Sequence, residues 1–196
     1  MRNLVRNLVL CLLASCAMAT AQQAAAPAAS ASTPAATGNP YSTFTKNAYT
    51  AISNILMHSA EKMPEENYSF KPVDSVRTYG QIVGHVADGQ YLFCSLALGE
   101  KRPDVKIEET KTSKADLVAA LKDAFAYCGK AYDGMTDASG AQMVKMFGTD
   151  TPKLGVLTVN NMHNMEHYGN LVTYMRIKGI VPPTSEPGFS PSAPKK

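Results

Sequence analysis

The sequence predicts an all-α protein whose folded part is a four-helix bundle. Four segments carry apolar side chains at intervals of three and four residues, which is the period of a helix with one buried face. Breaks rich in proline, glycine or charge separate them, and nothing between residues 40 and 183 has the pattern of a sheet. That span is long enough for one domain with a single core. The number of helices and the length of the connections therefore favour a bundle.

The first 21 residues have the pattern of an export signal. A basic stretch with Arg2 and Arg6 precedes an apolar run that is too short to span a bilayer, and alanines follow at the spacing that signal peptidase recognises. A second pattern, from Leu13 to Cys16, is typical of bacterial lipoproteins and would make Cys16 the lipidated first residue. We expect a periplasmic or secreted protein, with the lipid-anchored form as the alternative.

The remaining chain is nearly neutral and keeps two cysteines. Without Arg2 and Arg6 it has 17 basic and 16 acidic residues, a balance that argues against nucleic acid as a partner. An oxidising compartment allows Cys94 and Cys128 to form a disulfide. The pattern favours two small buried thiols on neighbouring helices instead.

Residues 22–39 and 184–196 are expected to be a flexible linker and a flexible tail. Both are rich in proline and small side chains, a composition that does not form a core. The domain is thus predicted to span residues 40–183.

The first two helices are predicted over residues 41–62 and 78–98. Pro64 stops the first, Thr78 and Gln81 form a capping box for the second, and Gly99 ends the second. The first apolar stripe consists of Phe44, Ala48, Ala51, Ile52, Ile55 and Leu56. The second consists of Ile82, His85, Val86, Gly89, Leu92, Phe93 and Leu96.

The third and fourth helices are predicted over residues 113–132 and 151–178. Ser113 caps the third, and Pro152 is expected at the first position of the fourth, which Gly179 ends. The charged segment 99–110 is expected to be a solvated loop. Residues 134–150 are expected to form a connection that folds over one end of the domain.

Three histidines are predicted to face the interior. His163 and His167 are four residues apart and so lie on one helix face, while His85 lies on the inward face of the second helix. Three neutral imidazoles from two helices can bind a divalent metal and leave a position open. The alternative for any one of them is a core histidine bonded to a carbonyl. His58, near the end of the first helix, is a further candidate for lining the site.

Other polar side chains near the pair have two interpretations each. Glu166 can orient a ligand or act as a base, or it can be an exposed partner for a lysine. Asn160 and Tyr174 share the stripe of the histidine pair and can line a substrate site or complete the core. The H-x-x-E-H spacing also occurs in zinc proteases, but the remaining sequence offers only Glu186 as a downstream acidic ligand.

Two longer motifs contain the histidines. Arg77-Thr78-x-x-x-Ile82-x-x-His85 opens the second helix, and the fourth contains His163-x-x-x-His167-x-Gly169-Asn170-Leu171-Val172-x-Tyr174-Met175-Arg176, followed by Gly179-Ile180-Val181-Pro182-Pro183. In these motifs the chain resembles the DinB family of four-helix-bundle metalloenzymes. The resemblance implies that His85, His163 and His167 bind a divalent metal, often nickel or zinc, with iron or manganese as alternatives.

The resemblance also implies a class of reaction. Family members with a known activity are mostly thiol-dependent transferases or isomerases. Here Glu166, Tyr168 and Asn170 depart from the common pattern around the second histidine, and the export signal separates the chain from cytosolic thiols. We expect a metal-dependent transferase or hydrolase acting on a small molecule, in a chain that can form a homodimer. The alternatives are a non-catalytic metal- or ligand-binding bundle and a bundle whose histidines are only core residues.

Overall fold

The computed structural model describes residues 38–192. The predicted export signal with Cys16, nearly all of the predicted linker and the last four residues lie outside this range. No helix within the described residues is long and apolar enough to cross a membrane.

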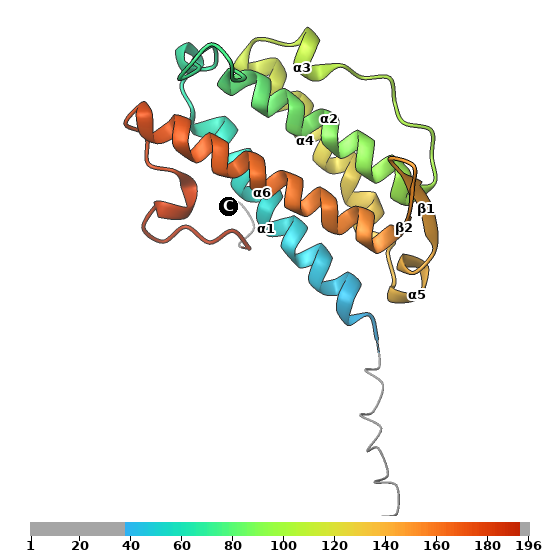
Figure 1. Ribbon diagram of the computed structural model, residues 1–196. Helices are drawn as coiled ribbons and strands as arrows, with labels where there is room; N and C mark the ends of the chain where they lie inside the picture. The colour runs from blue at the N-terminus through green and yellow to red at the C-terminus, as the bar shows by residue number, and fades with distance from the viewer. Residues whose placement is uncertain (1–37, 193–196) are drawn as a thin grey trace, which may run out of the picture. The chain divides into compact units, whose positions relative to one another are not determined.

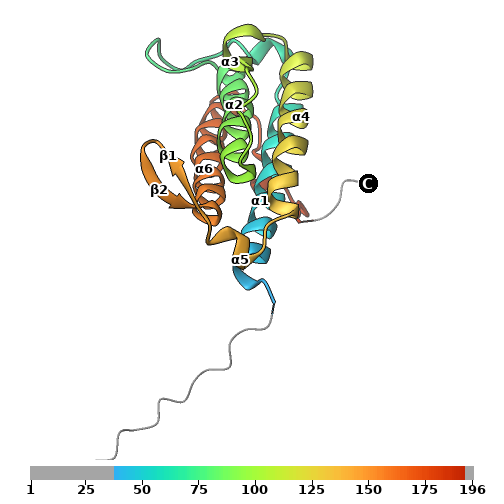
Figure 2. The same ribbon diagram turned by 90° about the vertical axis from the view of Figure 1, so that its right-hand side faces the viewer.

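The predicted four-helix architecture is confirmed. The long helices are α1 (Pro40–Lys62), α2 (Tyr79–Leu98), α4 (Lys114–Asp133) and α6 (Lys153–Ile177). Helices α1 and α2 each pack against both α4 and α6, so that the four surround one core (Figures 1 and 2). The short segments η1 (Glu65–Asn67), α3 (Ile107–Thr110) and α5 (Asp137–Gly140) connect them, and η2 (Pro183–Ser185) follows α6.

The ends of the long helices follow the local chemistry of the sequence. Thr78 accepts a hydrogen bond from the Gln81 amide, and the Gln81 side chain accepts one from Thr78 in return. Ser113 caps α4 by accepting from the Asp116 amide. Gly99 and Gly179, just beyond α2 and α6, have φ values of 75° and 72°, a left-handed conformation that favours glycine.

Tyrosines join the helices across the core. Tyr79 donates to the Ser59 carbonyl at 2.9 Å, and Tyr132 donates to the Leu157 carbonyl at 2.8 Å. Tyr49 donates to the Phe125 carbonyl at 2.8 Å. Because each hydroxyl reaches a backbone oxygen of another helix, these large rings are buried without an unpaired polar atom.

The interior also contains a disulfide that the sequence did not favour. Cys94 on α2 is bonded to Cys128 on α4, with a distance of 5.1 Å between the Cα atoms. The prediction of two free thiols was therefore wrong. The apolar stripes do place the two cysteines on facing helices, but the sequence pattern does not specify how far apart facing turns lie.

The connection between α4 and α6 contains a β-hairpin, which corrects the expectation that no part of the domain forms a sheet. Strands β1 (Met143–Met146) and β2 (Thr149–Pro152) are antiparallel, with Met146 opposite Thr149. Four residues per strand are too few for the alternating pattern to stand out in the sequence. As a result α6 begins at Lys153, and Pro152 lies at its N-cap instead of at its first turn.

Three smaller expectations also need correction. Phe44, predicted on the buried stripe of α1, is 75% exposed. Leu92 and Leu96 are only half-buried, because the buried face of α2 is centred on Val83, Val86 and Ala87. The charged segment after Gly99 is not wholly a solvated loop, since it contains α3, whose Ile107 is buried.

The first part of the predicted tail, up to residue 192, contacts α1. Glu186 forms ion pairs with Lys62 and His58. The ring of Phe189 lies 5.3 Å from that of His58, and the Asn54 side chain donates to the Pro191 carbonyl at 2.8 Å. This segment occupies the side of α1 near its C-terminal end.

Candidate metal centre

Three histidines from two helices converge at one point between α2 and α6. The Nε2 atom of His163 lies 3.1 Å from Nε2 of His85 and 3.1 Å from Nε2 of His167. The three groups can each offer one nitrogen, all within 4.8 Å of one another. The four-residue spacing on α6 and the phase of His85 on α2 thus produce the cluster that the sequence predicted.

A glycine on α2 makes room for the middle ring. A Cβ atom added to Gly89 would lie 2.7 Å from Cε1 of His163, which is closer than side chains pack. The ring of Phe93, one turn further along α2, contacts the same imidazole edge to face with centroids 5.4 Å apart. The imidazole of His163 therefore lies against the backbone of α2, because Gly89 leaves space for the ring and the ring of Phe93 packs beside it.

The short helix α3 orients His85. Oε2 of Glu108 lies 2.9 Å from Nδ1 of His85, and Oε1 accepts a hydrogen bond of 2.7 Å from Nε of Arg77. A carboxylate at Nδ1 favours the tautomer in which Nδ1 carries the proton, so that Nε2 presents its lone pair to the cluster. Burial raises the pKa of Glu108, but hydrogen bonds from Arg77 and His85 outweigh it and leave this pKa below its usual value.

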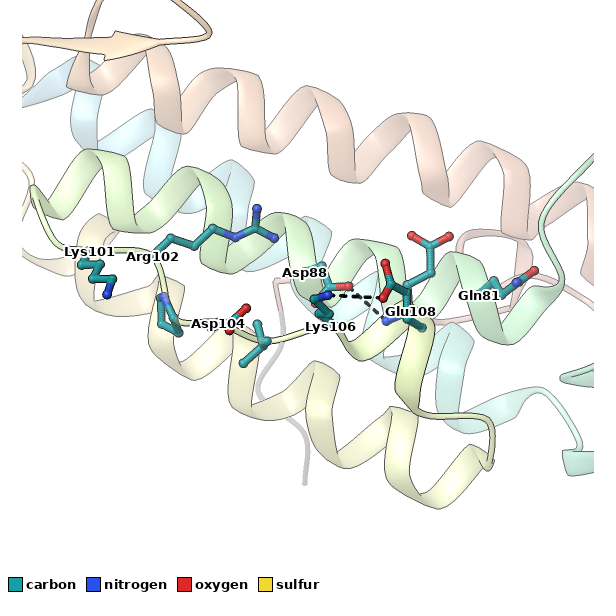
Figure 3. Close-up of a pocket in the computed structure, with 10 residues that line it drawn as sticks. Gln81, Asp88, Lys101, Arg102, Asp104, Lys106 and Glu108 are labelled. Atoms are coloured by element: carbon teal, nitrogen blue, oxygen red, sulfur yellow. Dashed lines mark hydrogen bonds and ion pairs between the residues drawn. The ribbon is translucent and has the colours of Figure 1, made fainter.

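Helix α2 in turn holds α3 in place. Asp88 accepts a hydrogen bond of 3.0 Å from the backbone amide of Glu108 (Figure 3) and another of 3.0 Å from that of Ile107. Gly84 allows the backbones to touch, since an added Cβ would lie 2.7 Å from the Cα of Glu108. The pocket drawn in Figure 3 lies beside this junction and is lined by none of the three histidines.

Hydrogen bonding among the three rings cannot satisfy all of them. With the proton of His85 on Nδ1, its Nε2 can only accept, so His163 must donate from Nε2. The same Nε2 lies 3.1 Å from His167, and one proton cannot point along both contacts. In this arrangement Nδ1 of His163 is buried with no hydrogen-bond partner among the described residues. A cation between the three Nε2 lone pairs removes the competition for the Nε2 proton, while Nδ1 of His163 keeps no partner among the described residues.

The spacing fits a metal ion. Metal–nitrogen distances of about 2.0–2.1 Å at tetrahedral angles separate two ligand nitrogens by about 3.3 Å. The two 3.1 Å separations observed here are close to that value. The donor set is also suitable, because it is made of neutral imidazoles with at least one oriented by a carboxylate.

Burial keeps two of the three rings neutral. Loss of hydration, followed by the neighbouring His167 and His85, lowers the pKa of His163 to about 4. Loss of hydration, followed by His85 and Arg77, lowers the pKa of His167 to about 4 as well. Both therefore have free lone pairs at neutral pH, which is the form that binds a metal.

Two grooves border the cluster. One, of about 710 Å³, is polar; it is lined by His167 together with Arg77, Asn170 and Tyr174. The other, of about 660 Å³, is lined by His163 and by apolar side chains of α2 and α6. His167 lines the first groove and His163 the second, so each groove reaches one histidine of the cluster.

The remaining candidates from the sequence lie in different surroundings. His58 is not part of the cluster and pairs with Glu186 instead. Asn160 is fully buried and donates to Gln90 and Tyr132, which makes it a core residue and not a substrate contact. Tyr174 lines the polar groove, and its hydroxyl donates to the Arg77 carbonyl at 2.7 Å.

Glu166 is on the surface beside His163. It lines the apolar groove and has no hydrogen-bond or ion-pair partner in the part of the chain that the structure describes. Neither the predicted ligand-orienting bond nor the alternative ion pair with a lysine is present. The orienting carboxylate is Glu108, which sequence reasoning missed because it lay in a segment interpreted as a solvated loop. Arg77, its partner, was visible in the motif that opens α2.

The amino-acid sequence is similar to a known family and to a curated protein. The profile of the DinB superfamily matches residues 48–171, a span that includes all three histidines. The uncharacterized protein YjoA of Bacillus subtilis (strain 168) is 26% identical over 129 residues, which are 64% of this chain and 83% of YjoA.

Two solved structures share the fold. A DinB-like protein from Bacillus cereus ATCC 10987 has a TM-score of 0.62 at 18% identity, covering 69% of this chain and 91% of that one. The structure of YjoA from Bacillus subtilis has a TM-score of 0.57 at 20% identity, covering 69% of this chain and 92% of that one.

Proposed function

Because this chain belongs to the DinB superfamily and brings three histidine nitrogens together between two helices, we propose that it binds a divalent metal through His85, His163 and His167. The observation that carries the proposal is the 3.1 Å spacing of the Nε2 atoms. Zinc and nickel are the expected ions, since imidazole nitrogens suit both.

The proposed activity is that of a metal-dependent transferase or hydrolase with a small-molecule substrate. When bound by three protein ligands, such an ion acts as a Lewis acid and lowers the pKa of whatever occupies its open position. Glu108 holds the proton on Nδ1 of His85 and so fixes the direction of its Nε2. Arg77 keeps Glu108 in place, and Asn170 and Tyr174 line the groove by which a polar substrate group can reach His167.

A non-catalytic role is the second candidate. It is favoured by the position of Glu166, the one base that the sequence suggested, which is exposed and makes no hydrogen bond to the histidines. In that case the bundle binds a metal and a small ligand without turnover. A panel of thiols with electrophiles, and of esters and amides, separates the two: turnover that is lost in His85→Ala supports an enzyme, and no turnover by the metal-loaded protein supports a binding module.

Metal content tests the proposal itself. The protein is purified without a histidine tag, and its metal is measured by mass spectrometry and by calorimetric titration. We expect one ion per chain in the wild type, none in His163→Ala/His167→Ala, and one in the control variant His58→Ala, whose ring pairs with Glu186. A wild-type protein without affinity for any of the ions tested would rule the proposal out.

Export is a separate proposal, supported by the basic and apolar pattern of residues 1–21. The mass of the mature N-terminus tests it. Cleavage near Ala21 is expected for a periplasmic or secreted protein, and a lipid on Cys16 would show membrane anchoring instead.

A further inference from the structure

The tip of the β-hairpin places an aromatic residue where the backbone disfavours it. Phe147 and Gly148 form the two-residue loop between Met146 and Thr149, and their φ values are 50° and 83°. Positive φ at both positions defines a type I′ turn, which favours Asn-Gly or Asp-Gly. Phe147 is also 73% exposed. A strained conformation that also exposes a large apolar ring works against stability, and such positions occur preferentially at functional sites.

Phe147 is connected to the histidines through one intervening ring. It contacts Phe93 edge to face, with centroids 6.4 Å apart, and Phe93 contacts His163 at 5.4 Å. Phe93 itself is only 5% exposed. The hairpin stands alongside α6 in Figure 2, and β1 and β2 both contact that helix. The exposed ring of Phe147 is therefore one aromatic ring away from His163, and that intervening ring, Phe93, also lines the apolar groove.

The groove at this side is apolar. Phe93, Val159, Met162 and Met165 line it together with His163, and Glu166 is its one charged lining residue. Met162 and Met165 are 65% and 46% exposed. Methionine side chains adapt their shape to different apolar ligands, and the volume of about 660 Å³ lies in the range of small-molecule sites.

We propose that this groove, with Phe147 at its edge, binds the apolar arm of a small molecule whose polar head binds at the three histidines. Continuity with the cluster supports this occupant, because His163 belongs to both. The carboxylate of Glu166 disfavours a negative charge in the arm, and the apolar side chains that line the rest of the groove favour an alkyl or aryl group. The inference rests on the proposed metal site and adds the substrate class: a metal-binding head with an apolar extension.

A series of alkyl hydroxamates tests the proposal. The head group chelates zinc and stays constant, while the chain grows from acetohydroxamate to octanohydroxamate. Zinc-loaded protein is titrated with each by calorimetry. Affinity is expected to rise about two- to fourfold for each added CH₂ group that enters the groove.

The variant Phe147→Asn distinguishes weaker binding of the apolar arm from a general loss of stability. Asparagine suits the left-handed position, so the melting temperature should rise by about 2–4 °C. The gain in affinity with chain length should become smaller, while acetohydroxamate should bind as before. Met162→Ser should also reduce the gain. Phe44→Gln, at a residue that is 75% exposed on α1, is the control and should leave the whole series unchanged.

The outcomes distinguish this inference from the metal site on which it rests. Zinc binding with no dependence on chain length, or with a dependence that survives both groove variants, would overturn the apolar subsite alone. Failure to bind zinc or any other divalent ion would overturn the metal site and the subsite together. If the wild type sediments as a dimer that Phe147→Asn and Met162→Ser convert to a monomer, a second copy of the chain covers the groove and the inference is wrong.

Discussion

At the level of single residues, Gly89 shows how closely the site depends on packing. The atom that an added Cβ would meet is at the end of the His163 side chain, which can move without disturbing the backbone. A methyl group at this position should therefore displace the imidazole more than it destabilises the bundle. Sequence reasoning placed Gly89 on the inward face of α2 but could not identify which ring it faces.

Gly89→Ala is expected to weaken metal binding by at least tenfold while leaving the free energy of unfolding within about 1 kcal/mol of the wild type. Calorimetric titration and denaturant unfolding measure the two quantities. Gly129→Ala is the matched control, because an added Cβ on α4 meets nothing within 4 Å. It should stabilise the protein by about 0.5–1 kcal/mol and leave metal affinity unchanged. Equal metal affinity in both variants would show that metal binding does not depend on the present position of the His163 ring.

The two buried imidazoles should also make stability depend on pH. Their pKa values are about 4 in the folded protein, against an ordinary value of 6.5. Between these values the unfolded chain binds protons that the folded chain does not, so the free energy of unfolding falls as the pH falls from about 6.5 to 4. The metal-free protein should show this slope in urea titrations. His163→Gln/His167→Gln should have a shallower slope, and an equal slope in both proteins would contradict the assignment.

At the level of elements, the four long helices were predictable and α3 was not. Capping residues and terminators that act locally, such as Thr78, Ser113 and Gly179, define the long helices. The short helix α3 has only four residues and depends on Asp88 and Gly84 of another helix. Such a tertiary contact leaves no periodic signal, and so Glu108 was missed together with the helix that carries it.

Glu108→Gln is expected to weaken metal affinity by about 10- to 100-fold, because an amide holds the proton on His85 Nδ1 less firmly than a carboxylate. The measurement is competition with a chelator of known affinity. Glu109→Gln is the control, since Glu109 is on the same short helix and, within residues 38–192, forms only a long ion pair of 3.8 Å with Lys106. If both variants bind metal as the wild type does, α3 has no part in the site.

The disulfide links α2, which carries His85, to α4. It closes a loop with a sequence separation of 34, for which loss of chain entropy on cross-linking corresponds to about 2–4 kcal/mol. Cys94→Ser/Cys128→Ser should therefore unfold at lower denaturant concentration by that amount. Unfolding of the wild type with and without a reductant should show the same difference. No difference in either comparison would mean that the cysteines are not paired in solution.

At the level of the whole molecule, the bundle explains where the site lies and why the sequence indicated it. Helix α2 packs against α4 and α6, and α6 packs against α1 and α2, so residues of α2 and α6 meet along one seam. His85, His163 and His167 lie on that seam. Helical phase was enough to predict this meeting, whereas the hairpin that adds Phe147 is set by a turn and by contacts that have no helical period.

X-ray absorption at the metal edge tests the three-histidine site most directly. The protein without a histidine tag is loaded with one equivalent of zinc. We expect three imidazole nitrogens at about 2.0–2.1 Å and one further ligand that exchanges with added hydroxamate. His85→Ala should reduce the imidazole count to two. A spectrum with fewer than three imidazoles in the wild type, or one that His85→Ala leaves unchanged, would contradict the site.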